Sequence, residues 1–592
     1  MRVLGYSGFD RSVPFKRARF PDLARREYRI VQGLDSAVAL VGDDGVEFAA
    51  AEERFSGAKS TGAFPVGAIR ACLEHARLKP DSIDVVAHAF AYDCVASFFQ
   101  HDDFSRAQYT EVYDPALQVE CLRTHFAGVD WASRFVAVPH HLAHAASAFY
   151  QSGFPESLIL VSDGMGEVQS ATILLGSGSE LSVVATVPAL HSIGVLYSVF
   201  TLYLGFAFNM DEYKVMGLAP YGDPRRYYSR IMELVRLQAD GTYTIPLFGE
   251  DRTLEEQQTH RGVLRVLTEL FGPPREPEGA MEQRFMDLAA ALQAVLQACQ
   301  LHVLAHFQQK TGARNLCMAG GVALNCTANG VIRRSRLFDD VFVQPAAGDD
   351  GAALGAALYV RHDRDRSAPR SRITAPLWGP GFDRSAIDRA AGESADVEIR
   401  RFASFDSLAE DAARRLADGE ILGWFQGRME FGPRALGNRS ILADPRAPDM
   451  RDRVNMLVKK RESFRPFAPA VAAEAAAEYF EIEDDEQTYE HMLFTMPVRP
   501  DYRDRLPAIT HVDGSARLQT VSKSSNERFW MLLRAFGRIT GIPMVLNTSF
   551  NVRGQPIVCT PEEAIHTFLL ARLDALVLGD LLLLPRKREV AQ

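Results

Sequence analysis

The chain has 592 residues, a net charge of −10, and 47% hydrophobic and 24% charged residues. This length is too great for one hydrophobic core, so we expect several domains in an otherwise ordinary soluble globular protein. The acidic balance argues against nucleic acid held on a broad basic surface. Seven scattered cysteines without a C-x-x-C pair, and an N-terminus unlike a signal peptide, predict a cytoplasmic location.

The first part of the chain alternates expected strands and helices. Strands are predicted at 3–6, 37–41, 46–51, 157–162, 171–175 and 315–319. Helices are predicted at 66–76 and 141–151, and one long helix or a helix pair at 281–311. This alternation, with glycines at strand ends, predicts an α/β fold. Residues 181–210 contain no Asp, Glu, Lys or Arg, but Pro188, Gly194 and Gly205 interrupt them. We therefore expect a buried strand and a buried helix there, and no membrane span.

Residues 366–380 combine charged residues, Ser and Pro, which is typical of a linker. They divide the chain into a first domain at 1–365 and a second at 381–592. Beyond the linker, a helix is expected at 407–417 and strands at 420–425 and 544–546. The sequence is also compatible with a homodimer.

A pair of histidines, His140 and His144, is spaced so that both rings lie on one helix face. Two acids, Asp163 and Asp349, each follow an apolar run and lie in glycine-containing turns. Two imidazoles and one or two carboxylates suit a divalent metal such as iron or zinc. The alternative is that the histidines only begin a helix and pack in its core.

Glycines gather at three turns of the first domain. Asp35 and Ser36 enter a strand, Gly164 and Gly166 follow the metal candidate Asp163, and Gly320-Gly321 lie between a strand and Asn325. Backbone amides at such turns bind anions, and the missing side chains allow a ligand to approach closely. Each turn alone is a weak signal; their order along the chain is stronger.

The second domain holds arginines and lysines beside Gly, Pro and aromatic residues, unlike a solvated helical face. Converging Arg and Lys at tight turns suit a small dianion. Uncharged Asn and Ser side chains directly after the strand at 544–546 would add further hydrogen bonds to such an anion. The candidates are Arg434, Arg439, Lys459, Arg461, Arg465, Arg517, Asn547, Ser549 and Asn551. In the alternative interpretation, some of these arginines tie loops to internal carboxylates such as Glu430 or Asp444.

These motifs, in this order, resemble the NodU/CmcH carbamoyltransferases. The strings are HHLAH, SDGMGE, MDEYKVMGLAPYG, AGGVALN and GDDG in the first half, and FGPRALGNRS, RPFAP and NTSFN in the second. The resemblance implies an actin-like ATPase domain followed by a YrdC-like α/β domain. It also implies that His140, His144, Asp163 and Asp349 hold an iron-type divalent ion. Gly320, Gly321 and Asn325 would meet adenosine, and Lys214 would face phosphate unless it is only an ion-pair lysine.

The family activity implies two steps. In the second domain, carbamoyl phosphate would react at the α-phosphate of ATP, bound with Mg²⁺, to give carbamoyl-adenylate, diphosphate and phosphate. In the first domain, the carbamoyl group would pass to a hydroxyl or amine of a small-molecule secondary metabolite, such as an antibiotic precursor. An internal path would protect the intermediate from water.

The base that deprotonates the acceptor is where this chain departs from the family, because Leu34 stands where a histidine is usual. The candidates are Asp35, Asp10 and His191. An inserted segment, residues 9–33, is rich in Arg and aromatic residues. We expect it to line the pocket of an acidic or aromatic acceptor; the alternative is a surface insertion.

Three other functions stay open. One is a tRNA threonylcarbamoyl-type modification enzyme, against which the acidic charge weighs. Another is a hydrogenase-maturation carbamoyltransferase, whose C-x-x-C zinc modules are absent from the sequence. The third is a non-catalytic actin-like scaffold.

Overall fold

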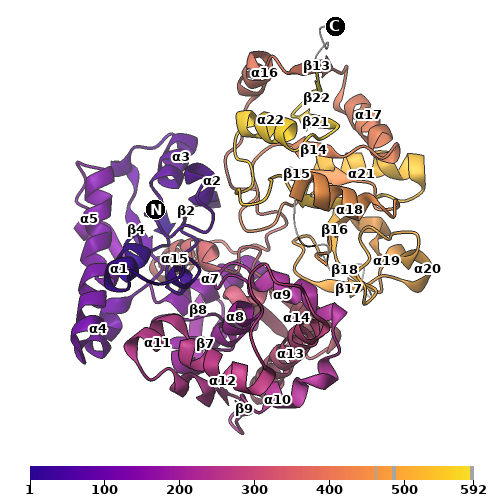
Figure 1. Cartoon of the computed structure of the whole chain (residues 1–592). Coiled ribbons are helices and arrows are strands. Elements are labelled where there is room, and N and C mark those ends of the chain that lie inside the picture. The colour runs from indigo at the N-terminus through magenta and orange to yellow at the C-terminus, as the bar shows by residue number, and fades with distance from the viewer. Residues whose placement is uncertain (460–461, 463, 483–488, 587–592) are drawn as a thin grey trace. The chain divides into compact units, whose positions relative to one another are not determined.

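The computed structural model describes residues 1–459, 462, 464–482 and 489–586. It divides into two compact units, unit 1 (Met1–Ser56 and Ser60–Ile373) and unit 2 (Gly57–Lys59 and Thr374–Gln592). The boundary between Ile373 and Thr374 lies inside the segment 366–380 that was expected to be a linker. Figure 1 shows the course of the chain from the N-terminus to the C-terminus.

Unit 1 contains two five-stranded sheets with the same connectivity. In the orders β3-β2-β1-β4-β5 and β8-β7-β6-β11-β12, the first three strands are antiparallel and the last three parallel. This duplicated sheet is the actin-like ATPase arrangement, so the predicted α/β fold class is confirmed. The strands are β1 Val3–Tyr6, β2 Ala37–Gly42, β3 Gly45–Ala51, β4 Val85–His88, β5 Phe135–Ala137, β6 Glu156–Ser162, β7 Gln169–Ser177, β8 Glu180–Pro188, β11 Asn315–Ala319 and β12 Asp340–Val343.

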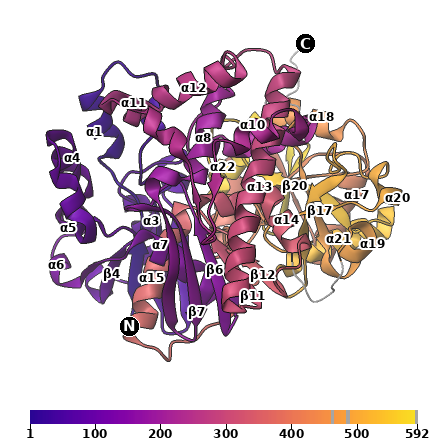
Figure 2. The same cartoon turned by 90° about the horizontal axis from the view of Figure 1, so that it is seen from below.

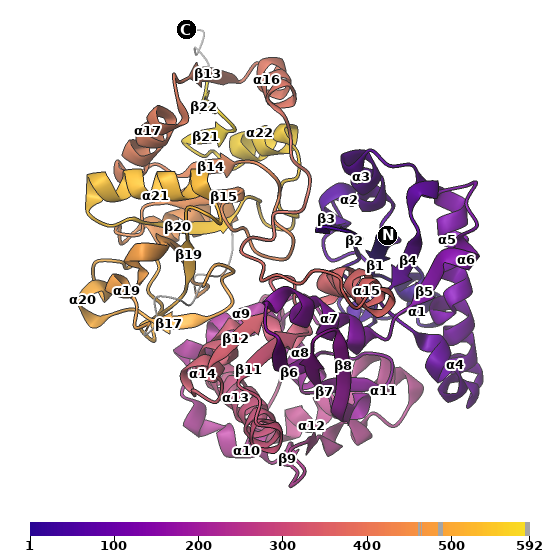
Figure 3. The same cartoon turned by 180° about the vertical axis from the view of Figure 1, so that it is seen from behind.

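Two helices lie back to back between these sheets. Helix α7 (His140–Ser152) packs on β6 and β11, and α15 (Asp349–Arg364) packs on β1 and β2. Figure 3 shows the two helices side by side. They approach closely because Gly355 of α15 has no side chain: a Cβ there would lie 1.7 Å from the carbonyl oxygen of Ala143 on α7. The N-terminal turns of both helices carry candidate metal ligands.

The remaining elements of unit 1 surround this core (Figure 2). The helices are α1 Ser12–Arg19, α2 Glu53–Ser56, α3 Val66–Ala76, α4 Asp103–Gln108, α5 Pro115–His125, α6 Trp131–Arg134, α8 Ile193–Tyr203, α9 Glu212–Leu218, α10 Tyr228–Met232, α11 Leu254–Thr259, α12 Arg261–Phe271, α13 Gln283–Thr311 and α14 Cys326–Arg334, with a small hairpin of β9 Arg236–Leu237 and β10 Tyr243–Thr244. Helix α13 is long and apolar enough to span a membrane, but 67% of its apolar window is buried, as in the core helix of a globular domain.

The segment 181–210 differs from the expectation in one respect. It forms a strand, β8, and a buried helix, α8, but the strand is not buried. Strand β8 is the edge of the second sheet, and the side chain of Val183 is 55% exposed. An apolar run predicts a strand without showing which neighbours cover it.

Unit 2 is built on one mixed sheet in the order β13-β22-β21-β14-β15-β20-β16-β19. Its strands are β13 Val397–Arg401, β14 Leu422–Phe425, β15 Arg439–Ala443, β16 Ala468–Ala472, β19 Gln519–Val521, β20 Met544–Ser549, β21 Ala575–Leu578 and β22 Leu581–Pro585, with a separate pair β17 Thr495–Pro497 and β18 Ser515–Arg517. The helices are α16 Arg384–Glu393, α17 Phe405–Ala417, α18 Met450–Val454, α19 Ala476–Tyr479, α20 Pro500–Arg503, α21 Glu527–Thr540 and α22 Pro561–Leu570.

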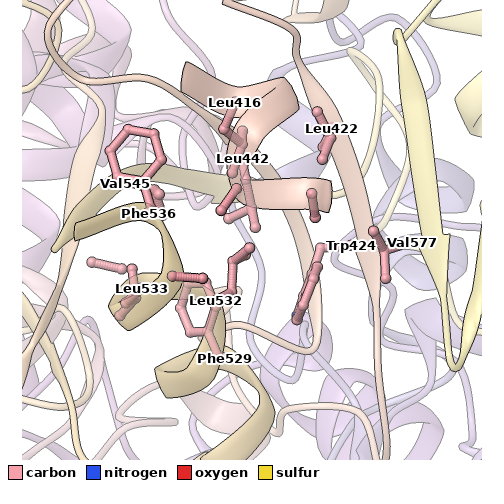
Figure 4. Packing of buried hydrophobic residues seen from close by; sticks show 14 of the residues in the cluster. Leu416, Leu422, Trp424, Leu442, Phe529, Leu532, Leu533, Phe536, Val545 and Val577 are labelled. Carbon is pink, nitrogen blue, oxygen red and sulfur yellow. The ribbon is translucent and has the colours of Figure 1, made fainter. Parts of the chain in front are cut away.

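The core of unit 2 lies between this sheet and the helices α17 and α21. Figure 4 shows Trp424 of β14 beside Phe529 and Leu532 of α21. The indole N–H of Trp424 donates to the carbonyl of Gly437, so the buried ring leaves no polar atom unsatisfied. This packing fixes the loop that precedes Arg439.

Candidate functional site

The four predicted metal ligands come together in unit 1. One ligand atom from each of His140, His144, Asp163 and Asp349 lies within 4.8 Å of all the others. The histidines stand on the first turns of α7, Asp349 begins α15, and Asp163 directly follows β6. A buried group of two imidazoles and two carboxylates is a suitable donor set for a divalent transition metal.

His140 is oriented by its surroundings. Its Nδ1 lies 2.9 Å from the carbonyl oxygen of Ala89, which fixes the proton on Nδ1 and leaves the Nε2 lone pair facing the cluster. The ring stacks on Phe90 with centroids 4.0 Å apart. Glu167 accepts from the backbone N–H groups of His140 and Ala91 and so joins the start of α7 to the segment after β4. Glu167 was not predicted as a site residue, although it closes the SDGMGE string.

The electrostatics of the cluster call for a cation. Burial lowers the pKa of His140, but the carboxylates of Asp349 and Asp163 outweigh burial and raise it well above its usual value. Burial raises the pKa of Asp163, but His140 and His144 outweigh it and hold it below its usual range. A divalent ion would take the place of the proton on His140. By contrast, burial and the neighbouring His140 lower the pKa of His141 to about 3.

The loop that starts at Asp163, which we call the metal loop (residues 163–167), is fixed by hydrogen bonds from other parts of unit 1. The N–H of Gly321 donates to Asp163 Oδ1 at 2.9 Å, and Ser192 Oγ donates to the carbonyls of Asp163 and Gly164. The amide of Gln32 donates to the carbonyls of Met165 and Gly166, both at 2.7 Å. Gln32 was not predicted, because its partners are backbone atoms.

Of the predicted nucleotide-binding residues, the glycines shape the backbone of the site, whereas the side chains of Asn325 and Lys214 already have protein partners. Gly320, with φ of 89°, allows the chain to pass β6, because a Cβ there would lie 2.3 Å from the carbonyl oxygen of Ser162. Gly164 faces open space. Asn325 instead caps α14 and pairs with the amide of Gln293, which occupies its side chain. Lys214 lies 3.1 Å from Asp211, so the structure shows an ion-pair lysine.

The three candidate bases have different environments. Burial and the neighbouring Glu53 raise the pKa of Asp35 to about 6. Asp10 is exposed and accepts from the N–H of Phe64. His191 Nδ1 accepts from the N–H of Ile245 at 3.2 Å, which places the proton of a neutral ring on Nε2. The other ring nitrogen of neutral His191 is then a donor and not a proton acceptor.

In unit 2, Arg439 is structural and is not available to a substrate. Its side chain is fully buried and donates to the carbonyls of Gln426, Asn438, Pro380 and Gly427. The guanidinium also lies 3.6 Å from the centroid of the Phe425 ring, and burial lowers its pKa to about 10. This corrects the expectation that Arg439 binds an anion.

The loop 430–439 is fixed by a carboxylate. Glu430 Oε1 accepts from the N–H groups of Leu436, Asn438 and Arg439 at 2.7, 2.7 and 3.1 Å. Asn547 donates to the carbonyl of Ala435 and to Gln519, so its amide also supports this loop. The loop presents Arg434 half-buried.

The other predicted anion-binding residues lie near strand ends or in loops. Ser549, in β20, donates to Asn551 Oδ1 at 2.7 Å. Arg517 ends β18, and Arg465 lies 3.6 Å from Glu462. The side chain of Lys459 and the whole of Arg461 lie outside the described residues.

The fold and the site define a two-unit α/β protein whose actin-like half carries a buried His–Asp cluster. Family models describe the same two halves: the carbamoyltransferase N-terminus matches residues 31–358, and the carbamoyltransferase C-terminus matches residues 413–584. The chain therefore belongs to the carbamoyltransferase family, as its motifs predicted.

Several relatives span most of the chain. Nodulation protein NolNO of Sinorhizobium fredii is 43% identical over 93% of this chain and 79% of its own length. Nodulation protein NolO of Bradyrhizobium diazoefficiens is 45% identical over 76% of this chain and 79% of its own length. An uncharacterised protein of Synechocystis, sll1178, is 38% identical over 93% of this chain and 95% of its own length.

Proposed function

We propose that the protein is an ATP- and metal-dependent carbamoyltransferase that converts carbamoyl phosphate and ATP into carbamoyl-adenylate and carbamoylates a small molecule at a hydroxyl or amine. The observation that carries this proposal is the convergence of His140, His144, Asp163 and Asp349 in the actin-like half of a carbamoyltransferase.

The activation half belongs to unit 2. Water cleaves the carbonyl carbon–oxygen or phosphorus–oxygen bond of carbamoyl phosphate, giving carbamate and phosphate. A carbamate oxygen then bonds to the α-phosphorus of ATP as diphosphate leaves. Negative charge accumulates in both steps, which is why cationic side chains are needed. We assign this role to Arg434, Lys459, Arg461, Arg465 and Arg517, supported by Ser549 and Asn551. Arg439 and Asn547 hold the surrounding loops instead.

The transfer half belongs to unit 1. His140, His144, Asp163 and Asp349 would hold a divalent ion, for which we propose Fe²⁺. The ion would supply Lewis acidity for the carbamoyl carbonyl. Gly164 faces open space and leaves room for the adenylate, and Gly320 and Gly321 form the turn that bonds to Asp163. Asp35 accepts the proton of the acceptor hydroxyl or amine while the new bond to the carbamoyl carbon forms and AMP leaves.

The test separates the two halves. Protein, ATP, Mg²⁺, carbamoyl phosphate and Fe²⁺ are incubated without an acceptor, and diphosphate and carbamoyl-adenylate are measured. We expect both products, and we expect Arg517→Ala to abolish them. As a control, Arg503→Ala alters a residue of α20 whose side chain donates to the carbonyl of Val498. No diphosphate across several divalent metals would contradict the activation step and favour a non-catalytic scaffold.

A further inference from the structure

The inserted segment, residues 9–33, folds onto unit 1 through buried polar contacts. Lys16 of α1 is buried and donates to the carbonyls of Ile30 and Gln258 at 2.7 and 2.6 Å. Glu27 pairs with Arg261 at the start of α12, at 2.9 Å. These contacts fix the course of the segment between α1 and the strand β2. The segment is therefore an ordered part of unit 1.

The C-terminal end of the segment reaches the metal loop. Gln32 bonds to Met165 and Gly166, and its Oε1 accepts from Tyr92. Three residues earlier, Arg29 donates through Nη2 to the carbonyl of Asn209 at 3.1 Å, and the Asn209 amide donates back to the carbonyls of Arg29 and Val31. Residues 29–32 thus span from the loop before α9 to the loop that carries Asp163.

The arginines of the segment differ in their partners. Arg11 and Arg19 form ion pairs with Glu120 and Glu111, and Arg17 lies over the ring of Tyr28. Arg25 and Arg26 are exposed to solvent. Arg29 is half-buried, and among the described residues no carboxylate lies within ion-pair distance of it. Its Nε is buried without a hydrogen-bond partner.

A partly desolvated guanidinium gains free energy from an anionic partner. Asp35 lies near enough for its charge to be felt: burial and Glu53 raise the pKa of Asp35, and Arg29 opposes them. Asp35 does not pair with Arg29 directly, so the guanidinium keeps donors for a ligand. Exposed Arg25 and Arg26 have water instead and need no such partner.

We propose that Arg29 binds an oxyanion of the acceptor, a carboxylate or phosphate borne by the molecule whose hydroxyl or amine is carbamoylated. Asn209 holds the backbone carbonyl of Arg29, and Gln32, three residues further on, bonds to the metal loop. This assignment rests on the proposed transferase function, because it names the acceptor class of the same site.

The test measures binding and not turnover. Glycerol, glycerate and glycerol phosphate are titrated into the full-length, metal-loaded protein, and binding is followed by saturation-transfer NMR. We expect wild type to bind one or both anions on the order of ten-fold more tightly than glycerol. The two anions distinguish a carboxylate site from a phosphate site. Arg29→Gln should remove the preference, and Arg25→Gln should keep it.

Three results would overturn the assignment. The first is equal binding of all three probes by wild type, and the second is an unchanged preference in Arg29→Gln. The third is weaker AMP binding by Arg29→Gln than by Arg25→Gln, which would mean that Arg29 binds the nucleotide and not the acceptor. Diphosphate release by the wild-type protein without an acceptor tests the transferase function separately.

Discussion

The Nε2 atoms of His140 and His144 lie 3.0 Å apart, and Asp349 Oδ1 lies 3.5 and 3.8 Å from them. In the neutral ring of His140 the proton on Nδ1 faces Ala89, so Nε2 is an acceptor. This nitrogen and the carboxylate oxygens that converge on it repel one another unless a cation, either a second proton on His140 or a metal ion, lies between them.

The first prediction is therefore metal binding at a stoichiometry of one per chain. His144→Ala should lose the ion and also the rise in thermal stability on adding metal. That rise corresponds to about 2.7 kcal/mol at a metal concentration 100-fold above Kd. Metal content and melting temperature are the measurements.

The matched control for metal binding is His141→Gln. His141 is adjacent and buried, but its Nδ1 bonds to Thr172 Oγ1 at 2.7 Å. This variant should retain the metal. Retention of one ion by His144→Ala would exclude the site.

The second prediction concerns Asp35 as general base. Asp35→Asn should lower the rate of carbamoyl transfer by about 10²–10⁴-fold and leave diphosphate release unchanged. Because the pKa of Asp35 is raised to about 6, its ionised form is lost as the pH falls through that value, and transfer should fall with it. A bound divalent ion favours the carboxylate and would shift this fall to lower pH.

Asp10→Asn and His191→Gln serve as comparisons in the same pH profile. We expect both to retain most transfer activity, because Asp10 is exposed and His191 presents a donor nitrogen. A larger loss in His191→Gln than in Asp35→Asn would assign the base to His191.

Local patterns predicted the fold well where one element is bounded by turns. The ranges Val3–Tyr6, Val66–Ala76 and Asn315–Ala319 agree residue for residue with β1, α3 and β11. The helix predicted at 281–311 begins at Gln283. The exposure of β8 could not be predicted, because a strand becomes an edge through the pairing of distant segments.

The site was predictable where chemistry depends on residue type and spacing. The four candidate metal ligands meet because α7, β6 and α15 bring them to one end of the unit 1 core. The role of Arg439 was not predictable, since the backbone carbonyls around it come from residues 380 and 426–438. Gln32 was missed for the same reason.

The third prediction concerns Gln32 as a positioning residue. Gln32→Leu leaves the carbonyls of Met165 and Gly166 without their donor, which costs about 0.5–1.5 kcal/mol for each of these partly exposed hydrogen bonds. We expect kcat for transfer to fall at least ten-fold while diphosphate release is unchanged. Gln32→Glu, which keeps the acceptor for Tyr92 but loses both donors, should behave similarly; full activity in both variants would show that the metal loop does not need this contact.

The fourth prediction separates stability from activity in unit 2. Arg439→Met removes a buried charge together with four hydrogen bonds that hold the loop 426–439, and should lower the free energy of unfolding by about 3–5 kcal/mol. Arg517→Ala should leave unfolding nearly unchanged and abolish diphosphate release. Denaturant titration beside the diphosphate assay measures both. If Arg439→Met is as stable as wild type but releases no diphosphate, Arg439 would be assigned to anion binding after all.

The last prediction concerns the pH dependence of stability and rests on Lys16. Burial lowers the pKa of Lys16 from 10.5 to about 7, although Glu27 partly opposes this. Between these two values the unfolded chain binds a proton that the folded chain does not, so the contribution of Lys16 to stability increases as the pH rises. Lys16→Met should flatten the dependence of the unfolding free energy on pH between about 7 and 10. Arg25→Met, in the same segment but exposed, should leave it unchanged. An equal slope in wild type and Lys16→Met would mean that Lys16 keeps its proton through its bonds to Ile30 and Gln258.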